Sequence, residues 1–299
     1  MSTTRKEPVK SVESVSEFVG LMTSLSDNGQ APTAFRGQKY FGWSSIPKVF
    51  RPEVNLLNSE DLAVRDIVSV HPHEFESDKT MFDRLVRMQH YGLPTRLLDV
   101  TINPLVALFF ASDEYRNKDG VPMAGTVTSY IIPKARQRYY DSDRVSCMAN
   151  LANLKIKTKE EIFKLAEEKP SIEDFNKESC ADELLYNIQM EKPHFRPIIN
   201  PLDLVKPVYV KPKMNNKRII AQSGAFLLYG ALNVRGRKSE TLMRVHRLSI
   251  PHEAKADIKK QLQLLGIHSS TLFPEIDKTA EFITSRYQGM ARDNDDSLL

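Results

Sequence analysis

The chain has 299 residues, 41% of them hydrophobic and 27% charged, which is enough to bury the core of one large domain or two small ones. Its formal net charge of +4 permits a polyanionic partner, but it lacks the dense Lys/Arg patch of a dedicated nucleic-acid binder. The first ten residues hold charges and no apolar segment, and no apolar run approaches the ~20 residues of a membrane span. Cys147 and Cys180 lie far apart and indicate neither a disulfide framework nor a zinc site, so we expect a cytoplasmic protein.

An amphipathic helix is predicted at the start of the chain. Apolar residues recur at helical spacing between Ser11 and Asn28, and Gly29 is a typical helix stop. We therefore assign residues 1–30 to an N-terminal helical segment. A short strand over residues 33–38 follows it.

This predicted strand contains the tetrapeptide Phe35-Arg36-Gly37-Gln38. A guanidinium binds phosphate or carboxylate through two parallel hydrogen bonds, and a glycine lets a ligand approach the backbone. The tetrapeptide is therefore a candidate anion-binding element, and the alternative is a surface arginine ahead of a turn. Tyr40 and Trp43 follow, either as core packing or as a stacking wall.

Two further helices are predicted over residues 59–70 and 75–88, where apolar side chains again recur at helical spacing. Between them lies His71-Pro72-His73. Because no cysteine or third histidine is nearby, we expect no metal site there.

The central stretch runs from Gln89 to Thr101 and continues into a helix that starts at Pro104, with Asn103 as its N-cap. The helix is apolar nearly all round, so we expect it to be buried. Helix N-termini carry unpaired N–H groups and a partial positive charge, and this one follows a run of polar side chains. The combination predicts an anion site. The alternative is a capped helix preceded by a structural ion pair between Arg96 and Asp99.

The second half of the chain is read as strands interrupted by a helical insertion at about residues 136–201. Strands are predicted over 125–133, 207–210 and 244–250, and residues 216–230 are read as two strand pieces with a polar break at Gln222-Ser223-Gly224. Helices over 254–265 and 276–287 and a tail at 291–299 complete the chain. The order lacks regular βα alternation, a dinucleotide fingerprint, a P-loop and a nucleophile elbow, which favours an α+β single domain.

Four segments resemble the FRG domain family, which takes its name from a Phe-Arg-Gly triplet. The long central stretch is the most specific of them, and it departs from the family at Val100, where an aromatic residue is often found. The segments are Phe35–Gln38, Gln89–Ala111, Arg218–Phe226 and Leu272–Ile276.

The resemblance implies a remote branch of the ADP-ribosyltransferase fold. We therefore expect a split β-sheet core, preceded by N-terminal helices and carrying the helical insertion, in a domain over residues 31–290. By the same resemblance, Arg36 holds a phosphate or ribose of NAD, Thr95 or Thr101 cradles the nicotinamide, and Gln222 bonds the nicotinamide ribose. The implied catalytic residues are Arg36, Thr101 and Gln222, and the implied NAD-binding residues are Arg36, Gly37, Gln38, His90, Tyr91, Thr95, Arg96 and Asp99.

The expected activity is transfer of ADP-ribose from NAD, as substrate and without a metal, to a macromolecule. The mildly basic charge and the insertion favour RNA or DNA as the acceptor, and a protein acceptor is the alternative. The resemblance further implies a toxin in anti-phage defence, with a neutralising antitoxin and no membrane partner. A non-catalytic nucleotide- or nucleic-acid-binding module is the rival hypothesis, because Gln222 offers no carboxylate; Asp99 would supply one if it faces the pocket. A metal-dependent nuclease would need clustered carboxylates, which the central stretch lacks.

Overall fold

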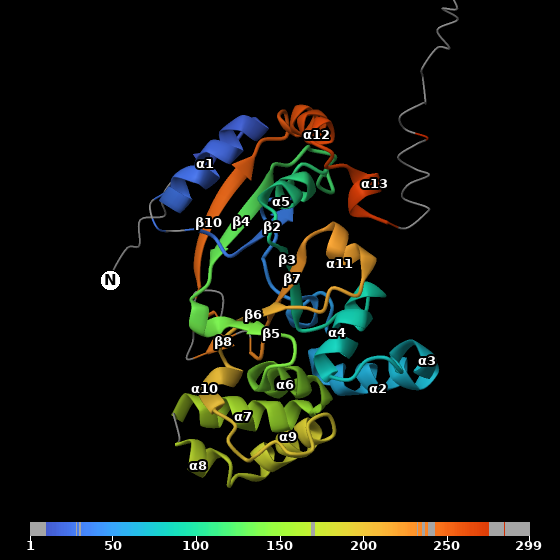
Figure 1. The fold of residues 1–299 in the computed structure, drawn as a ribbon, viewed down its shortest axis with the longest axis vertical. Coiled ribbons are helices and arrows are strands. Elements are labelled where there is room, and N and C mark those ends of the chain that lie inside the picture. The colour runs from blue at the N-terminus through green and yellow to red at the C-terminus, as the bar shows by residue number, and fades with distance from the viewer. Residues whose placement is uncertain are drawn as a thin grey trace, which may run out of the picture.

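An eight-stranded mixed β-sheet runs through the molecule, with helices packed on both sides and at both ends (Figure 1). The computed structural model describes residues 10–27, 29, 31–168, 171–231, 233–234, 237–238, 243–274 and 284. In spatial order the strands are β1-β10-β4-β2-β3-β7-β6-β5. Their bounds are β1 Lys10–Ser11, β2 Ala34–Gln38, β3 Leu97–Thr101, β4 Gly125–Ile131, β5 Gln137–Tyr139, β6 Val208–Lys211, β7 Gly224–Leu228 and β10 Arg244–Ile250, beside a separate pair, β8 Asn233–Val234 and β9 Arg237–Lys238.

The sheet consists of two four-stranded halves that are joined narrowly. All of β2 pairs with β4, and all of β3 pairs with β7. Between β2 and β3, however, the register contains only the pair of Phe35 with Thr101. We call this junction the seam. The predicted α+β class is confirmed. The sheet is one continuous eight-stranded sheet with this seam in its middle, so the predicted split of the sheet is not seen.

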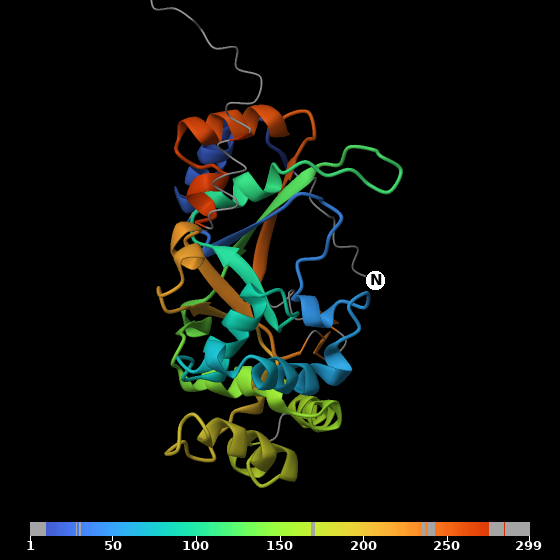
Figure 2. The same ribbon diagram turned by 90° about the vertical axis from the view of Figure 1, so that its right-hand side faces the viewer.

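Helices cover the two ends of the sheet (Figures 1 and 2). At one end α1, α5, α12 and α13 enclose a core with β10, β4 and β2, and at the other α4, α6, α7 and α9 enclose a core with β6 and β7. A third core, which includes Phe50, Leu98, Tyr130 and Tyr229, lies between them. The helices are α1 Val15–Asp27, α2 Glu60–Val70, α3 Pro72–Phe75, α4 Met81–His90, α5 Pro104–Ala111, α6 Asp143–Asn150, α7 Ile156–Glu168, α8 Ile172–Phe175, α9 Ser179–Gln189, α10 Pro201–Leu204, α11 Lys217–Ala221, α12 Lys255–Leu264 and α13 Ser269–Leu272.

The helical insertion is the connection between β5 and β6. These two strands are parallel, so the chain must cross over between them, and α6 to α10 form that crossover. The insertion forms the end of the molecule opposite α1 and α12 (Figures 1 and 2). Its helices span residues 143–204, and the predicted insertion therefore began too early, because β5 lies within its first residues.

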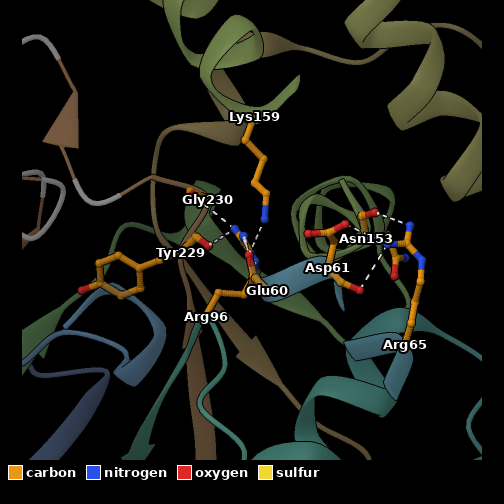
Figure 3. A network of polar contacts seen from close by, with 8 residues as sticks. All are labelled: Glu60, Asp61, Arg65, Arg96, Asn153, Lys159, Tyr229 and Gly230. Atoms are coloured by element: carbon orange, nitrogen blue, oxygen red, sulfur yellow. Dashed lines mark hydrogen bonds and ion pairs between the residues drawn. The ribbon is translucent and has the colours of Figure 1, made fainter. Parts of the chain in front are cut away.

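A buried charge network fastens the insertion to the sheet (Figure 3). Glu60 accepts hydrogen bonds from Arg96 Nε (2.9 Å) and from Lys159 Nζ of α7 (2.7 Å), and all three side chains are at most 1% exposed. Burial alone would raise the pKa of Glu60, but the charges of Arg96 and Lys159 outweigh it, so the pKa of this carboxyl is lowered. The network is structural, because none of its members reaches the surface.

Several predicted elements are confirmed. Strand β10 spans Arg244–Ile250 as predicted, β4 coincides with the predicted strand, and α5 is buried with the Asn103 side chain accepting the N–H of Leu105 (3.0 Å). Cys147 and Cys180 are both buried free thiols, and burial raises the pKa of Cys147 to about 12. The described part of the chain contains no helix of the length and apolarity that crossing a membrane requires.

Other predicted elements are wrong. The predicted helix over 75–88 is broken, because Thr80 accepts the N–H of Asp83 and starts α4 afresh (3.1 Å). Residues 217–221 form a helix instead of a strand, since the Asn216 side chain accepts the N–H of Arg218 (2.8 Å) and caps it. Strand β3 was not predicted at all. The predicted helix over 276–287 and the tail fall outside the described residues.

Candidate functional site

A cavity of about 330 Å³ lies at the seam of the sheet. Its lining comes from both halves: residues 35–37 of β2 on one side, and residues 97–101 of β3 and 224–226 of β7 on the other. The end of α4, the residues around α11 and the connector after β2 complete it. The narrow pairing of β2 with β3 thus coincides with the opening of a site between the two halves.

The cavity is strongly cationic. Its lining includes four cations, Arg36, Lys48, Arg51 and Arg218, and among the described residues of the lining Asp99 alone is acidic. None of the four cations forms an ion pair within the described part of the chain. Burial, and then the positive charge of Arg36, lower the pKa of Arg51. Two guanidinium groups that repel each other in a cleft favour an anionic ligand between them.

Arg36 points from β2 across the seam. Its Nη1 donates to the backbone carbonyl of Asp99 (2.6 Å). Its Nε is buried and has no hydrogen-bond partner among the described residues. A buried guanidinium N–H without an acceptor is costly, so a ligand oxygen at this position would be stabilising.

Asp99 is held in place by Gln89 of α4. The Gln89 Nε2 donates to Asp99 Oδ1 (2.8 Å), while Gln89 Oε1 accepts the hydroxyl of Thr95. Thr95 is 1% exposed and does not line the cavity, so it acts through Gln89. Among the two threonines that the sequence left open, Thr101 is the one that lines the cavity.

Gln222 lines the cavity from the end of α11, not from a strand. Its Nε2 donates to the carbonyl of Leu272 (3.1 Å), and its Oε1 accepts no hydrogen bond from the described residues. Thr101 donates its hydroxyl to the Gln222 carbonyl (2.7 Å) and accepts the N–H of Asn103 (3.0 Å). Thr101 therefore fastens the end of β3 to the turn that carries Gln222, while the Gln222 Oε1 is available to a ligand.

Four residues of the predicted NAD-binding set do not line the cavity: Thr95, described above, and Arg96, Tyr91 and Gln38. The Arg96 guanidinium is 0% exposed and bonds Glu60 and the carbonyls of Tyr229 (3.1 Å) and Gly230 (3.0 Å), so it cannot reach a ligand (Figure 3). Tyr91 is 57% exposed, and its hydroxyl donates to Glu74 (3.0 Å). Gln38 is buried, and its Oε1 accepts the hydroxyl of Ser45 (2.6 Å). His90, by contrast, lines the cavity as predicted.

The alternative ion pair between Arg96 and Asp99 is also wrong. Side chains alternate between the faces of an extended chain, and positions three apart therefore point to opposite faces. Arg96 accordingly lies with Glu60 on one face, while Asp99 meets Gln89 on the other. Because β3 is not among the predicted strands, no pattern in the sequence indicates that the two side chains point to opposite faces.

Gly37 lines the cavity, and it also allows α5 to pack closely on β2. A Cβ at this position would lie 1.8 Å from the carbonyl oxygen of Ala107, inside the backbone of the helix. The glycine beside Arg36 is thus required by packing. The amino terminus of α5 itself does not contribute to the cavity, because residues 102–105 do not line it, so the anion site predicted at this helix end does not coincide with the cavity.

Among the polar side chains of the cavity, sequence reasoning missed Lys48, Arg51, Gln89, Asn216 and Arg218. Lys48 and Arg51 lie in the turn-rich connector after β2, where no periodic pattern indicates direction. Arg218 lies in one of the four segments that carry the family resemblance, which was an available signal. Among the described residues, no three His, Cys, Asp or Glu side chains are grouped so that they could hold a metal ion.

The fold and site define an α+β protein with a cationic cavity between the halves of its sheet. Residues 31–120 match the model of the FRG domain. The match covers β2, β3 and α5, hence Arg36, Asp99 and Thr101, and it ends before α11 and Gln222. No curated protein and no solved structure matches the chain.

Proposed function

We propose that this protein is an ADP-ribosyltransferase that binds NAD in the cavity at the seam and transfers ADP-ribose to a macromolecule. The observation that carries the proposal is the group of four cations in the cavity lining that have no ion-pair partner among the described residues and that share the lining with the carboxylate of Asp99. NAD matches this arrangement, because its pyrophosphate is anionic and its nicotinamide ribose becomes cationic when the glycosidic bond breaks. The volume of about 330 Å³ is within the range of small-molecule sites.

In this proposal Arg36 and Arg51 bind the pyrophosphate. Arg36 Nε is buried and has no acceptor among the described residues, and the positive charge of Arg36 lowers the pKa of Arg51. A phosphate oxygen between the two guanidinium groups would accept the Nε–H and offset their mutual repulsion. Arg218 and Lys48 add positive charge around the same cavity. Charge-assisted hydrogen bonds from several fixed donors would hold the dinucleotide in one orientation.

The chemical step requires stabilisation of a cation. The bond between the ribose C1′ and the nicotinamide nitrogen breaks, and its electron pair leaves with the nicotinamide, which becomes neutral and needs no general acid. The Asp99 carboxylate, fixed by Gln89, stabilises the positive charge that develops on the ribose. Gln222 Oε1 accepts a hydrogen bond from a ribose hydroxyl. The acceptor then supplies the electron pair for the new bond at C1′, and its proton passes to Asp99 or to water.

The net charge of +4 favours a nucleic-acid acceptor over a protein, and a toxin role in anti-phage defence with a neutralising partner is part of the proposal. A second candidate is a nucleotide-binding module without catalysis. Gln222 favours it, because this side chain is neutral and Asp99 is then the only carboxylate available to a bound ribose.

Incubation of the purified chain with NAD labelled on its adenylate phosphate, followed by fractionation of a cell lysate into protein, RNA and DNA, tests the proposal. We expect label in one macromolecular fraction and its loss with Gln222→Ala. Lys164→Ala serves as the control and should leave labelling unchanged, because Lys164 is exposed on α7 of the insertion and does not line the cavity. Bound but intact NAD would favour the binding module, and the absence of NAD binding would overturn both candidates.

A further inference from the structure

A second cavity, of about 780 Å³, lies beside the first at the start of β7. Gly224 and Ala225 line both. Ala225 packs with Val100 and Tyr209 on the face of the second cavity, whereas Asp99 and its partner Gln89, which line only the first cavity, lie on the other face of the sheet. The end of β3 and the turn before β7 therefore separate two neighbouring cavities.

Tyrosine and lysine side chains dominate the second cavity. In parallel register, Gln137 pairs with Tyr209 and Tyr139 with Lys211, which places all four side chains on one face of the sheet. We call the surface formed by Tyr139, Tyr140, Tyr209, Lys211 and Lys213 the tyrosine–lysine groove. None of the described residues in its lining is Asp or Glu.

Each lysine of the groove is placed over an aromatic ring. Lys211 Nζ lies 5.4 Å from the ring centroid of Tyr139, and Lys213 Nζ lies 4.8 Å from that of Tyr140. Lys213 also pairs with Asp83 (2.7 Å), whereas Lys211 has no ion-pair partner in the described part of the chain. Tyr139 is 63% exposed, so its ring and the Lys211 charge are presented to solvent together, above the buried ring of Tyr209.

We infer that the tyrosine–lysine groove binds single-stranded nucleic acid. Exposed aromatic rings stack on unpaired bases, and neighbouring lysines contact the phosphates, which is how proteins hold single strands without reading their sequence. A duplex offers no free base faces, so it fits the exposed ring of Tyr139 poorly. No described residue of the lining is a carboxylate, and the nearby Asp83 is paired with Lys213, so a phosphate backbone would meet little repulsion in the groove.

The position of the groove gives it a role that rests on the proposed function. A strand in the groove would pass close to the edge formed by Ile102 and Ser223, beyond which the NAD cavity begins. The Ile102 side chain is 56% exposed at this edge, and Ser223 has a positive φ of 48°, so the turn is sharp. The groove would therefore present a nucleotide of the acceptor strand to the ribose C1′ of NAD.

Binding is tested with the full chain, in the absence of NAD, by fluorescence anisotropy of labelled twelve-residue oligouridylate and oligothymidylate. We expect Tyr139→Ala to weaken binding about ten-fold through lost stacking. We expect Lys211→Ala to reduce the slope of log affinity against log salt by about 0.7, which is the contribution of one phosphate contact on a single strand. Lys213 is left unchanged, since its removal would also unpair Asp83.

Matched controls lie in the insertion. Tyr186 is 66% exposed on α9, and Lys164 is exposed on α7, so Tyr186→Ala and Lys164→Ala make the same chemical changes away from the groove. Both should bind the oligonucleotides as the parent does. The inference would be overturned if the parent did not bind the oligonucleotides, or if Tyr139→Ala and Lys211→Ala bound them as well as the parent does. A groove that binds a protein segment instead would show no oligonucleotide binding.

Calorimetry with NAD separates this inference from the proposed function. Arg36→Gln should lose NAD and keep the oligonucleotide, and Tyr139→Ala should show the reverse. If the oligonucleotide binds through Tyr139 and NAD does not bind at all, the groove stands and the proposed function fails. If NAD binds and no oligonucleotide does, the groove fails and a protein acceptor replaces it.

Discussion

Arg36 and Asp99 meet across the seam, where Arg36 Nη1 donates a 2.6 Å hydrogen bond to the Asp99 backbone carbonyl. The two residues come from strands that share one residue pair, Phe35 with Thr101. The bond leaves the Asp99 carboxylate to Gln89 and leaves Arg36 Nε without a partner. One contact thus connects the two halves of the sheet and sets an anion-binding group beside a carboxylate.

The first prediction concerns Arg36. Arg36→Gln should weaken NAD binding about ten-fold to a hundred-fold, because a charge-assisted hydrogen bond contributes about 1.5–3 kcal/mol. Isothermal titration calorimetry measures the effect. Arg65→Gln is the matched control, since Arg65 lies on α2 and bonds Asp61 and the Asn153 carbonyl far from the cavity (Figure 3). Equal NAD affinity for the parent and Arg36→Gln would remove Arg36 from the site.

The second prediction separates binding from chemistry at Asp99. Asp99→Asn keeps an oxygen that can accept from Gln89 but removes the negative charge. We expect kcat to fall about a hundred-fold or more, as when one preorganised electrostatic group is lost, with NAD affinity nearly unchanged. Single-turnover release of nicotinamide checks the rate. A variant as fast as the parent would show that the carboxylate does not stabilise the ribose cation.

The elements predicted correctly are those whose bounds depend on residues within or next to the element, such as a cap, an apolar run or a proline. Strand β10 follows from its apolar run and the Pro251 stop, and α5 follows from its Asn103 cap. Residues 217–221 were misread because Ile219 and Ile220 are typical of strands, and the Asn216 cap overrode that preference. The apolar stripe through 75–88 was continuous in the sequence, and it hid the cap at Thr80.

Cavity residues could be predicted from the sequence only where they lie in a segment that resembles the FRG domain family. Arg36, Asp99 and Gln222 are distant in the chain and line one cavity, as the family resemblance implied. No motif indicated that Arg51 lines the cavity, because its position depends on how the connector after β2 folds over the seam. Arg96 was misplaced because its direction depends on the alternation of side chains in the extended chain at β3. Its partner Glu60, which also pairs with Lys159, lies on a helix distant in the sequence.

The third prediction compares two glycines. Gly37→Ala would place a Cβ 1.8 Å from the Ala107 carbonyl, so α5 must move, and we expect the free energy of unfolding to fall by about 1–3 kcal/mol or more. Gly20→Ala meets nothing within 4 Å in α1 and should raise it by about 0.5–1 kcal/mol. Urea unfolding measures both. Equal stability of the two variants would contradict the packing of α5 on β2.

The fourth prediction concerns the buried network of Glu60, Arg96 and Lys159. Glu60→Gln leaves two buried cations without their counter-charge, and we expect a loss of about 3–5 kcal/mol in the free energy of unfolding. Lys159→Met should cost less, because Arg96 still pairs with Glu60 and the stem of the new side chain fills the same space.

The pH dependence of stability follows from the same group. The pKa of Glu60 is lower in the folded chain than its ordinary value of 4.5, so its contribution is present above that value and is lost as the pH falls through the lowered pKa. The Tm of the parent should therefore drop below about pH 4.5 more steeply than that of Glu60→Gln, in which no group titrates at this position. Calorimetric measurement of Tm for both proteins between pH 3 and pH 7, at steps of about half a pH unit, tests this difference in slope. Parallel curves for the two proteins would show that the charge of Glu60 does not hold α7 to the sheet.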